Sequence, residues 1–159
     1  MTATSIPEGM NEKEYYETIV SEEEFLRWYK EQDQPTYENP SVTADMVAYC
    51  FVEGRLKLLV IRRKTHPCQH RVALVGGFLQ KHEDAIQACI REVQEEVGLE
   101  FTPQKVEQLM TVSTPGRDPR GWVITIAHLV YLPAEAVNLV RAGDDAKEVL
   151  FLDVDFKQG

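Results

Sequence analysis

Three glutamates that lie close together are the residues of this chain best suited to chemistry. Glu92, Glu95 and Glu96 are three and four residues apart, so on a helix they would be neighbours. Like charges at these spacings repel and weaken a helix, by about 0.2–0.5 kcal/mol per pair. A hard divalent cation, which prefers oxygen ligands, would reverse this penalty. The alternative is a solvated acidic face; the chemical interpretation is a site for Mg²⁺ or Mn²⁺, ions that usually also contact substrate phosphates.

The residues around the glutamates form a longer pattern, from Gly77 to Leu99. It reads G-x5-E-x7-R-E-U-x-E-E-x-G-U, where U is a bulky aliphatic residue. A solvated acidic face requires none of the positions outside the glutamates. The pattern resembles the signature box of the Nudix hydrolases, and every position of the box is matched.

The resemblance implies a role for each residue of the box. It implies that the metal ligands are the backbone carbonyl of Gly76 and the carboxylates of Glu92, Glu95 and Glu96. Four further residues would support the site from behind: Gly77, Glu83, Arg91 and Gly98. In this family the arginine at the position of Arg91 pairs with the glutamate at the position of Glu83, which braces the ligands.

The proton acceptor is left open by the resemblance. In some family members a box glutamate serves, which here means Glu92 or Glu96, whereas ADP-ribose pyrophosphatases use a glutamate of a late loop. That loop would correspond to the acidic segment around Asp145, so Asp145 is the third candidate. A solvated turn is the alternative for this segment.

The segment 114–121, T-P-G-R-D-P-R-G, bears on the substrate. Pro115 lies 16 positions after Leu99, a spacing associated within the family with ADP-ribose pyrophosphatases. Arginines on a turn beside a metal site could bind phosphate or ribose oxygens bidentately, or the segment could be an ordinary hairpin turn. The candidate substrate-binding residues are Arg62, Arg117, Asp118 and Arg120.

The resemblance therefore implies metal-dependent hydrolysis of a nucleoside diphosphate linked to another group, foremost ADP-ribose to AMP and ribose 5-phosphate. Two alternatives stay open: an ADP-ribose-sensing domain of a transcriptional regulator, and a hydrolase of modified nucleoside triphosphates. ADP-ribose hydrolases are usually homodimers, so a homodimer is expected. The general base, the number of metal ions and any continuation past Gly159 are not fixed by the sequence.

Composition narrows the class of protein. The 159 residues, 43% of them hydrophobic, suffice for one domain and a small appendage. A net charge of −9 gives no general attraction to nucleic acid or to an anionic membrane. Without a membrane-spanning run, a secretory signal or a disulfide framework among its three cysteines, the chain is expected to be cytoplasmic.

The order of the predicted elements indicates a mixed α/β domain. Residues 1–41 read as a tail, a short amphipathic helix with a capping box at Ser21, and a linker, and residues 42–159 as the main domain. The predicted strands cover 42–52, 56–62, 72–75, 105–114, 122–132 and 148–153; the predicted helices cover 84–97 and 134–140. The resemblance implies an α-β-α sandwich around a mixed β-sheet.

Overall fold

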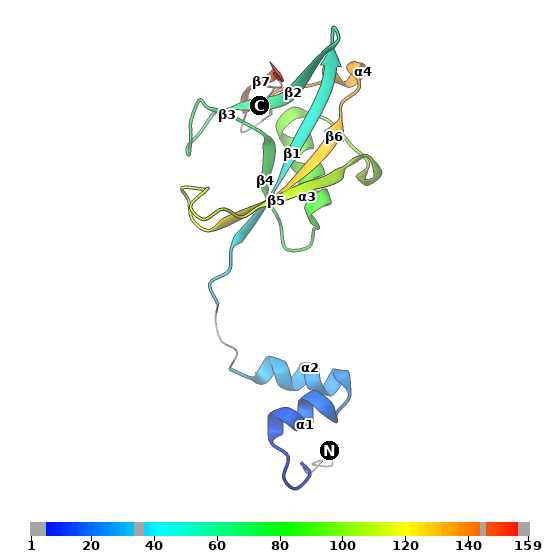
Figure 1. The fold of residues 1–159 in the computed structure, drawn as a ribbon, viewed down its shortest axis with the longest axis vertical. Coiled ribbons are helices and arrows are strands. Elements are labelled where there is room, and N and C mark those ends of the chain that lie inside the picture. The colour runs from blue at the N-terminus through cyan, green and yellow to red at the C-terminus, as the bar shows by residue number, and fades with distance from the viewer. Residues whose placement is uncertain (1–5, 34–36, 144–145, 156–159) are drawn as a thin grey trace. The chain divides into compact units, whose positions relative to one another are not determined.

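The computed structural model describes residues 6–33, 37–143 and 146–155, and the chain forms two units, 1–38 and 39–159. Figure 1 shows helices in the first unit and a sheet with further helices in the second. Within the described ranges no helix is long and apolar enough to cross a bilayer.

The N-terminal unit is a pair of short helices, α1 (Glu12–Thr18) and α2 (Glu22–Glu31). The capping box predicted at the start of α2 is confirmed, because Ser21 and Glu24 cap each other's backbone. The sequence interpretation missed α1, which begins at an Asn11 cap. Seven residues are too few to be stable alone, and Tyr16 of α1 stacks on Trp28 of α2 at 4.8 Å between ring centroids.

The main unit is built on a seven-stranded mixed sheet, which confirms the predicted fold class. Its strands are β1 (Ser41–Val52), β2 (Arg55–Arg63), β3 (Val72–Ala73), β4 (Val75–Phe78), β5 (Glu107–Val112), β6 (Val123–Tyr131) and β7 (Ala146–Asp153). The strand order is β3-β2-β1-β6-β5, with β4 added on β1 and β7 on β2. The pair β1–β6 is parallel and the other pairs are antiparallel.

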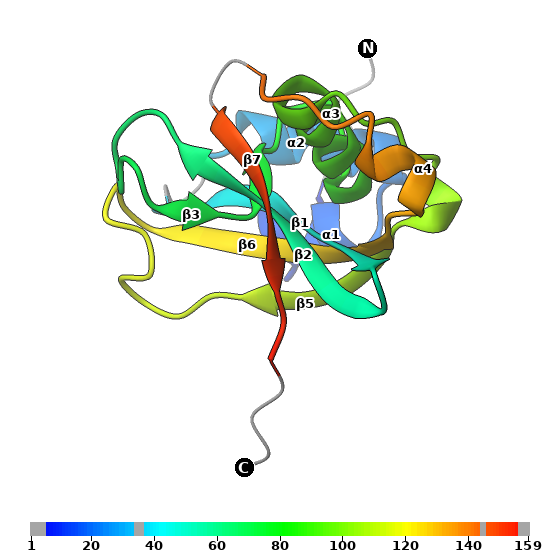
Figure 2. The ribbon, with the colours of Figure 1, turned by 90° about the horizontal axis from the view of Figure 1, so that it is seen from above.

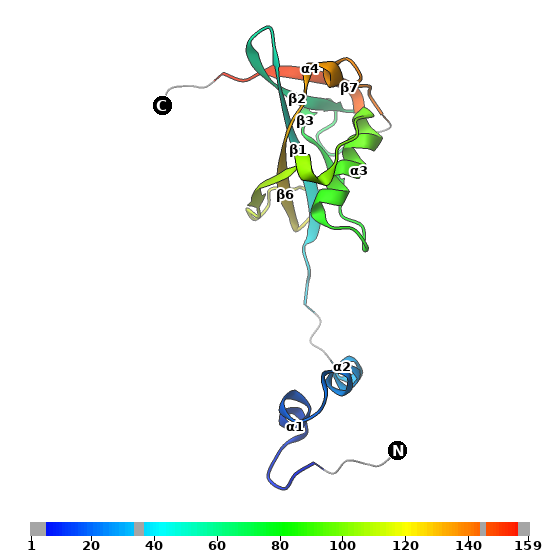
Figure 3. The same ribbon diagram turned by 90° about the vertical axis from the view of Figure 1, so that its right-hand side faces the viewer.

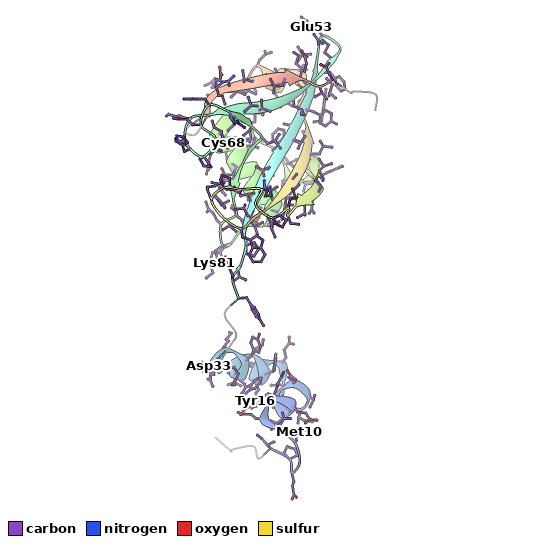
Figure 4. All side chains as sticks on the ribbon, turned by 60° about the vertical axis from the view of Figure 1, so that its left-hand side comes forward. Met10, Tyr16, Asp33, Glu53, Cys68 and Lys81 are labelled. Atoms are coloured by element: carbon purple, nitrogen blue, oxygen red, sulfur yellow. The ribbon has the colours of Figure 1, made fainter. Side chains whose placement is uncertain are left out.

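The long strand β1 places the segments that matter for the site. One end pairs with β2 through a hairpin whose tip is Glu53, and the other end pairs with β4 (Figure 4). The β4 register sets Gly76 opposite Asp45. The turn after β4 contains Lys81 and leads directly into the next helix, so the predicted box folds as a strand, a turn and a helix.

The helix α3 (Ala85–Val97) packs on one face of the sheet, as Figures 2 and 3 show. Asp84 caps its first turn, and Gly98 ends it in the left-handed conformation with φ 72°. Fully buried side chains at helical spacing face the strands: Ala88, Cys89, Val93 and Val97. Burial raises the pKa of the Cys89 thiol to about 12, so Cys89 is a core residue rather than a nucleophile.

Some predicted boundaries were too long. A short 3-10 turn, η1 (Pro103–Lys105), occupies the start of the strand predicted at 105–114. The helix predicted at 134–140 is the single turn α4 (Ala134–Val137). Hydrophobic spacing fits a strand or a helix equally well over such short runs, so their ends depend on local turn bonds.

The segment after α4 closes the C-terminal end of α3. Gly143 donates its N–H to the Glu96 carbonyl at 2.7 Å, and a Cβ on Gly143 would lie 2.0 Å from the Glu95 carbonyl oxygen. We therefore expect Gly143→Ala to lower the free energy of unfolding by about 1–3 kcal/mol, because backbone has to move. Urea denaturation measures this, with the exposed Ala142→Ser as the control; equal midpoints for Gly143→Ala and wild type would contradict this packing.

Candidate active site

A cavity of about 790 Å³ opens between α3, β4 and the sheet. The carboxylates of Glu92 and Glu96, both on α3, contribute to its wall, and so does the loop between β5 and β6. Residues from six strands, β1 to β6, complete the wall, among them Thr43, Asp45, Arg63, Gly76, Gly77, Phe78, Met110, Val112, Thr125 and Ala127. The cavity thus brings segments that are far apart in the sequence to the glutamates of the box.

The three box glutamates do not share one surface. Glu92 has a side chain that is 15% exposed, Glu96 is 8% exposed, and the Glu95 side chain is 58% exposed. The spacing of the three glutamates does not reveal that Glu96 is buried whereas the Glu95 side chain is largely exposed. Residues four apart are only about 40° apart around a helix, so Glu92 and Glu96 face the cavity together, whereas Glu95 is turned away by about 60° from Glu92.

Arg91 holds this end of the site together. Its Nε and Nη2 donate to Glu83 at 3.0 and 2.6 Å, and its Nη1 donates to Glu92 at 2.5 Å and Glu95 at 3.2 Å. Its Nη2 also reaches the Phe78 carbonyl at 3.1 Å. Hydrogen bonding to Arg91 lowers the pKa of Glu83, so the Glu83–Arg91 pair stays fully ionised at neutral pH.

We expect Arg91→Lys to lower turnover by about tenfold and to weaken binding of the divalent metal by a similar factor. A lysine cannot reproduce the fork that bonds Glu83 with two nitrogens while it also reaches Glu92. Partners that orient ligands contribute on this scale. Mn²⁺ titration calorimetry and steady-state kinetics measure both effects, and unchanged metal affinity would show that Arg91 does not position the carboxylates.

The paired glycines are required by close packing. A Cβ on Gly77 would lie 2.4 Å from the Glu92 carboxylate carbon, so the carboxylate packs directly against this backbone. A Cβ on Gly76 would lie 2.4 Å from the Ala44 carbonyl oxygen and 2.7 Å from the Asp45 Cα. Glycine at both positions therefore lets α3, β4 and β1 approach each other.

The carboxylate and carbonyl oxygens of the cavity wall are of the type that coordinates a hard cation. Mg²⁺ is usually held by one or two carboxylates together with substrate phosphates and water. Among the residues that the structure describes, no three acidic, histidine or cysteine side chains gather closely enough to form a complete metal cage. Glu92 and Glu96 would supply the two carboxylates, and a bound cation would compete with Arg91 for Glu92.

The sequence interpretation missed Asp45, a carboxyl in the cavity wall. It accepts a hydrogen bond from the Thr125 hydroxyl, and burial raises its pKa. The signal that could have found it is an acidic residue inside the β-rich run 42–52, where Ala44 and Met46 point into the core and Thr43 and Asp45 to the other face. His128 is completely buried, and burial lowers its pKa.

The loop between β5 and β6 contributes three of the four predicted substrate-binding residues to the cavity: Arg117, Asp118 and Arg120. Arg117 donates one long bond, of 3.5 Å, to the Val123 carbonyl, and no ion pair to it occurs within the described ranges. The fourth residue, Arg62, pairs with Glu148 outside the described cavity wall, which contains its neighbour Arg63 instead. The side chains of one strand alternate, so a shift of one residue decides which of the two reaches the cavity.

Two further segments carry side chains of types that can accept protons or bind metals. Asp145, the candidate base of the late loop, lies outside the described residues. The loop between β2 and β3 carries Cys68, labelled in Figure 4, and this cysteine is exposed. Within the described ranges His66, Cys68 and His70 form no metal group.

Comparison with known proteins identifies the family to which the chain belongs. The family model of the NUDIX domain matches residues 41–155 of the sequence. An ADP-ribose pyrophosphatase of Methanocaldococcus jannaschii is 37% identical over 144 residues, which cover 90% of this chain and 76% of that protein. An ADPR responsive transcriptional repressor of Acinetobacter baylyi is 33% identical over 73% of this chain and 45% of its own length.

Solved structures agree with this grouping. A MutT/nudix family protein from Enterococcus faecalis superposes with a TM-score of 0.85 and 41% identity, over 97% of this chain and 59% of that chain. The NUDIX domain of Shewanella oneidensis NrtR, complexed with ADP ribose, has a TM-score of 0.69 and 25% identity, with 84% of each chain covered. Sequence, fold and the residues of the box agree, and the chain belongs to the Nudix hydrolase family.

Proposed function

We propose that this Nudix hydrolase cleaves the diphosphate bond of ADP-ribose and releases AMP and ribose 5-phosphate. The observation that supports this most is the single cavity that joins Glu92 and Glu96 to the arginines of the loop between β5 and β6. A diphosphate flanked by two sugars needs both a cation site and basic or polar groups beside it. The similarity to an ADP-ribose pyrophosphatase over most of the chain supports the choice of substrate.

The proposed reaction is a hydrolysis at phosphorus. A water oxygen forms the new bond to one phosphorus, the bridging P–O bond breaks, and the other phosphate leaves. Mg²⁺, or Mn²⁺ in its place, would neutralise charge on the diphosphate and lower the pKa of the attacking water. Glu92 and Glu96 would hold it, with the Gly76 carbonyl as a further ligand and Glu95 nearby at the surface.

The other residues would orient the substrate and move the proton. Arg91 holds Glu92 in place from behind, and Arg117 has donors available for a phosphate oxygen. The water's proton would pass to a carboxylate, for which Glu92, Glu96 and Asp145 are the candidates. The exposed side chain of Met110 and the nearby Val112 add apolar surface to the wall of the cavity.

A second candidate function is ADP-ribose sensing without turnover. It is favoured by the similarity to a repressor and to a regulator domain complexed with ADP ribose. The intact set of box carboxylates favours hydrolysis. The proposed homodimer and cytoplasmic location remain predictions, and light scattering tests the first.

Hydrolysis of a substrate panel tests the proposal. It contains ADP-ribose, NADH, a dinucleoside polyphosphate and oxidised dGTP, each with Mg²⁺ and then with Mn²⁺. We expect ADP-ribose to have the highest kcat/KM. Tight binding of ADP-ribose with no turnover of any member would favour the sensor, and faster turnover of oxidised dGTP would favour nucleotide-pool cleaning.

A further inference from the structure

Arg120 lies in the cavity wall, where Asp118 and Phe78 hold its side chain. Its Nε and Nη2 donate to the two Asp118 oxygens at 3.0 and 2.8 Å, and its backbone N–H donates to Asp118 Oδ1 at 2.9 Å. Its guanidinium carbon lies 4.7 Å from the centre of the Phe78 ring. The guanidinium is thus bonded to Asp118 along one edge and contacts the Phe78 ring, while the side chain remains 44% exposed.

The pairing with Asp118 makes Arg120 a poor partner for a phosphate. The hydrogen bonds from Arg120 hold the pKa of Asp118 at about 2, so Asp118 is ionised at neutral pH and offsets the charge of the guanidinium. A phosphate at Arg120 would also meet the negative oxygens of Asp118. Among the described residues no carboxylate is hydrogen-bonded or salt-bridged to Arg117, although Asp45 and Asp118 act on it electrostatically, so its donors are better placed to bind an anion.

A flat aromatic group, unlike a phosphate, can bind well at Arg120. A guanidinium plane stacks well on aromatic rings and is weakly hydrated, and its charge need not be free for stacking. The Arg120 guanidinium lies over the Phe78 ring, so a nucleobase on the side of Arg120 away from Phe78 would complete a stack of three groups. Both Arg120 and Phe78 line the cavity that contains Glu92 and Glu96.

We infer that Arg120, backed by Phe78, is the stacking platform for the nucleobase, with a preference for a purine over a pyrimidine. This inference rests on the proposed function, because it assigns the base of the nucleotide to one part of the same cavity. Arg91 binds the Phe78 carbonyl at 3.1 Å and Glu92 at 2.5 Å. The same arginine therefore fixes the distance between the platform and the carboxylates that would hold the metal.

A neighbouring pocket offers the competing place for the base. It is lined by Pro115, Pro119, Trp122 and Ile124, and it also touches Asp118. Trp122 is 51% exposed and could stack with a ring as well. Because Arg120 lines the cavity with the carboxylates and Trp122 does not line its described wall, the platform on Arg120 is the one we assign.

Equilibrium binding of AMP and UMP to the full chain tests the inference, because these ligands share phosphate and ribose and differ in the base. In calorimetry the wild type should bind AMP more tightly than UMP. Arg120→Lys keeps the positive charge but removes the planar guanidinium. It should weaken the binding of AMP about tenfold and the binding of UMP about twofold or less. Phe78→Leu should act in the same direction and Phe78→Tyr should retain the preference.

The matched control is Arg117→Lys, which should weaken the binding of AMP and of UMP by a similar factor. Equal weakening of AMP and UMP by Arg120→Lys would overturn the inference, since it would make Arg120 a phosphate ligand. Loss of the preference in Trp122→Leu instead would place the base in the neighbouring pocket and also overturn it. Absence of ADP-ribose hydrolysis by the wild type would reject the proposed function alone, because the two binding constants would still decide where the base stacks.

Discussion

Glu92→Gln and Glu96→Gln should each lower kcat for ADP-ribose by at least about a hundredfold. Both carboxylates line the cavity, and both are more than four-fifths buried. A glutamine is close in size to a glutamate and removes only the charge and one oxygen donor. The loss of one such electrostatic group from a catalytic site typically costs two to three orders of magnitude.

Two companion variants sharpen this result. Glu100→Gln, an exposed change just beyond α3, should leave kcat within about twofold of the wild type. Glu95→Gln should have a smaller effect than the two cavity variants, because the Glu95 side chain is 58% exposed. Near-normal rates for both Glu92→Gln and Glu96→Gln would remove the assigned site, and a Glu95→Gln enzyme as slow as these two would mean that the glutamates regroup when substrate binds.

Gly77→Ala should lower kcat/KM by about ten- to a hundredfold and leave the thermal midpoint almost unchanged. The added Cβ would lie 2.4–2.6 Å from the carboxylate atoms of Glu92, which are the far end of a flexible side chain. The side chain can rotate away at small cost to stability. Its carboxylate would then leave its place at the cavity wall, and displacements of about 1 Å can cost a hundredfold in rate.

Gly76→Ala is the matched contrast for this prediction. Here the added Cβ would meet the backbone of Ala44 and Asp45, which cannot move without disturbing the pairing of β1 with β4. We expect this variant to lose stability as well as activity, as differential scanning calorimetry would show. A Gly77→Ala enzyme with normal kinetics would contradict the assigned position of Glu92.

The sequence predicted the parts of the fold that carry strong local signals. The capping box at Ser21 and the box glycine Gly98 both fix a helix end within a few residues. The helix predicted at 84–97 agrees with α3 to within one residue. The mixed sheet followed from the order of elements together with the resemblance.

What could not be predicted depends on contacts between distant segments. Asp45 belongs to the cavity because β1 pairs with β4 and β6, which the sequence does not state. The backbone of Glu95 and Glu96 at the end of α3 is covered by Gly143, about fifty residues later in the chain. The different surroundings of Arg117 and Arg120 could not be predicted either, because Asp118 could have paired with either arginine. Within the described residues it forms a salt bridge with Arg120 only.

The most direct test is a crystal structure with Mg²⁺ and a nonhydrolysable analogue of ADP-ribose bound. We predict a metal ion on Glu92 and Glu96 that touches the diphosphate, with the adenine against Arg120. A structure in which these carboxylates bind no metal and the analogue lies outside this cavity would contradict the account.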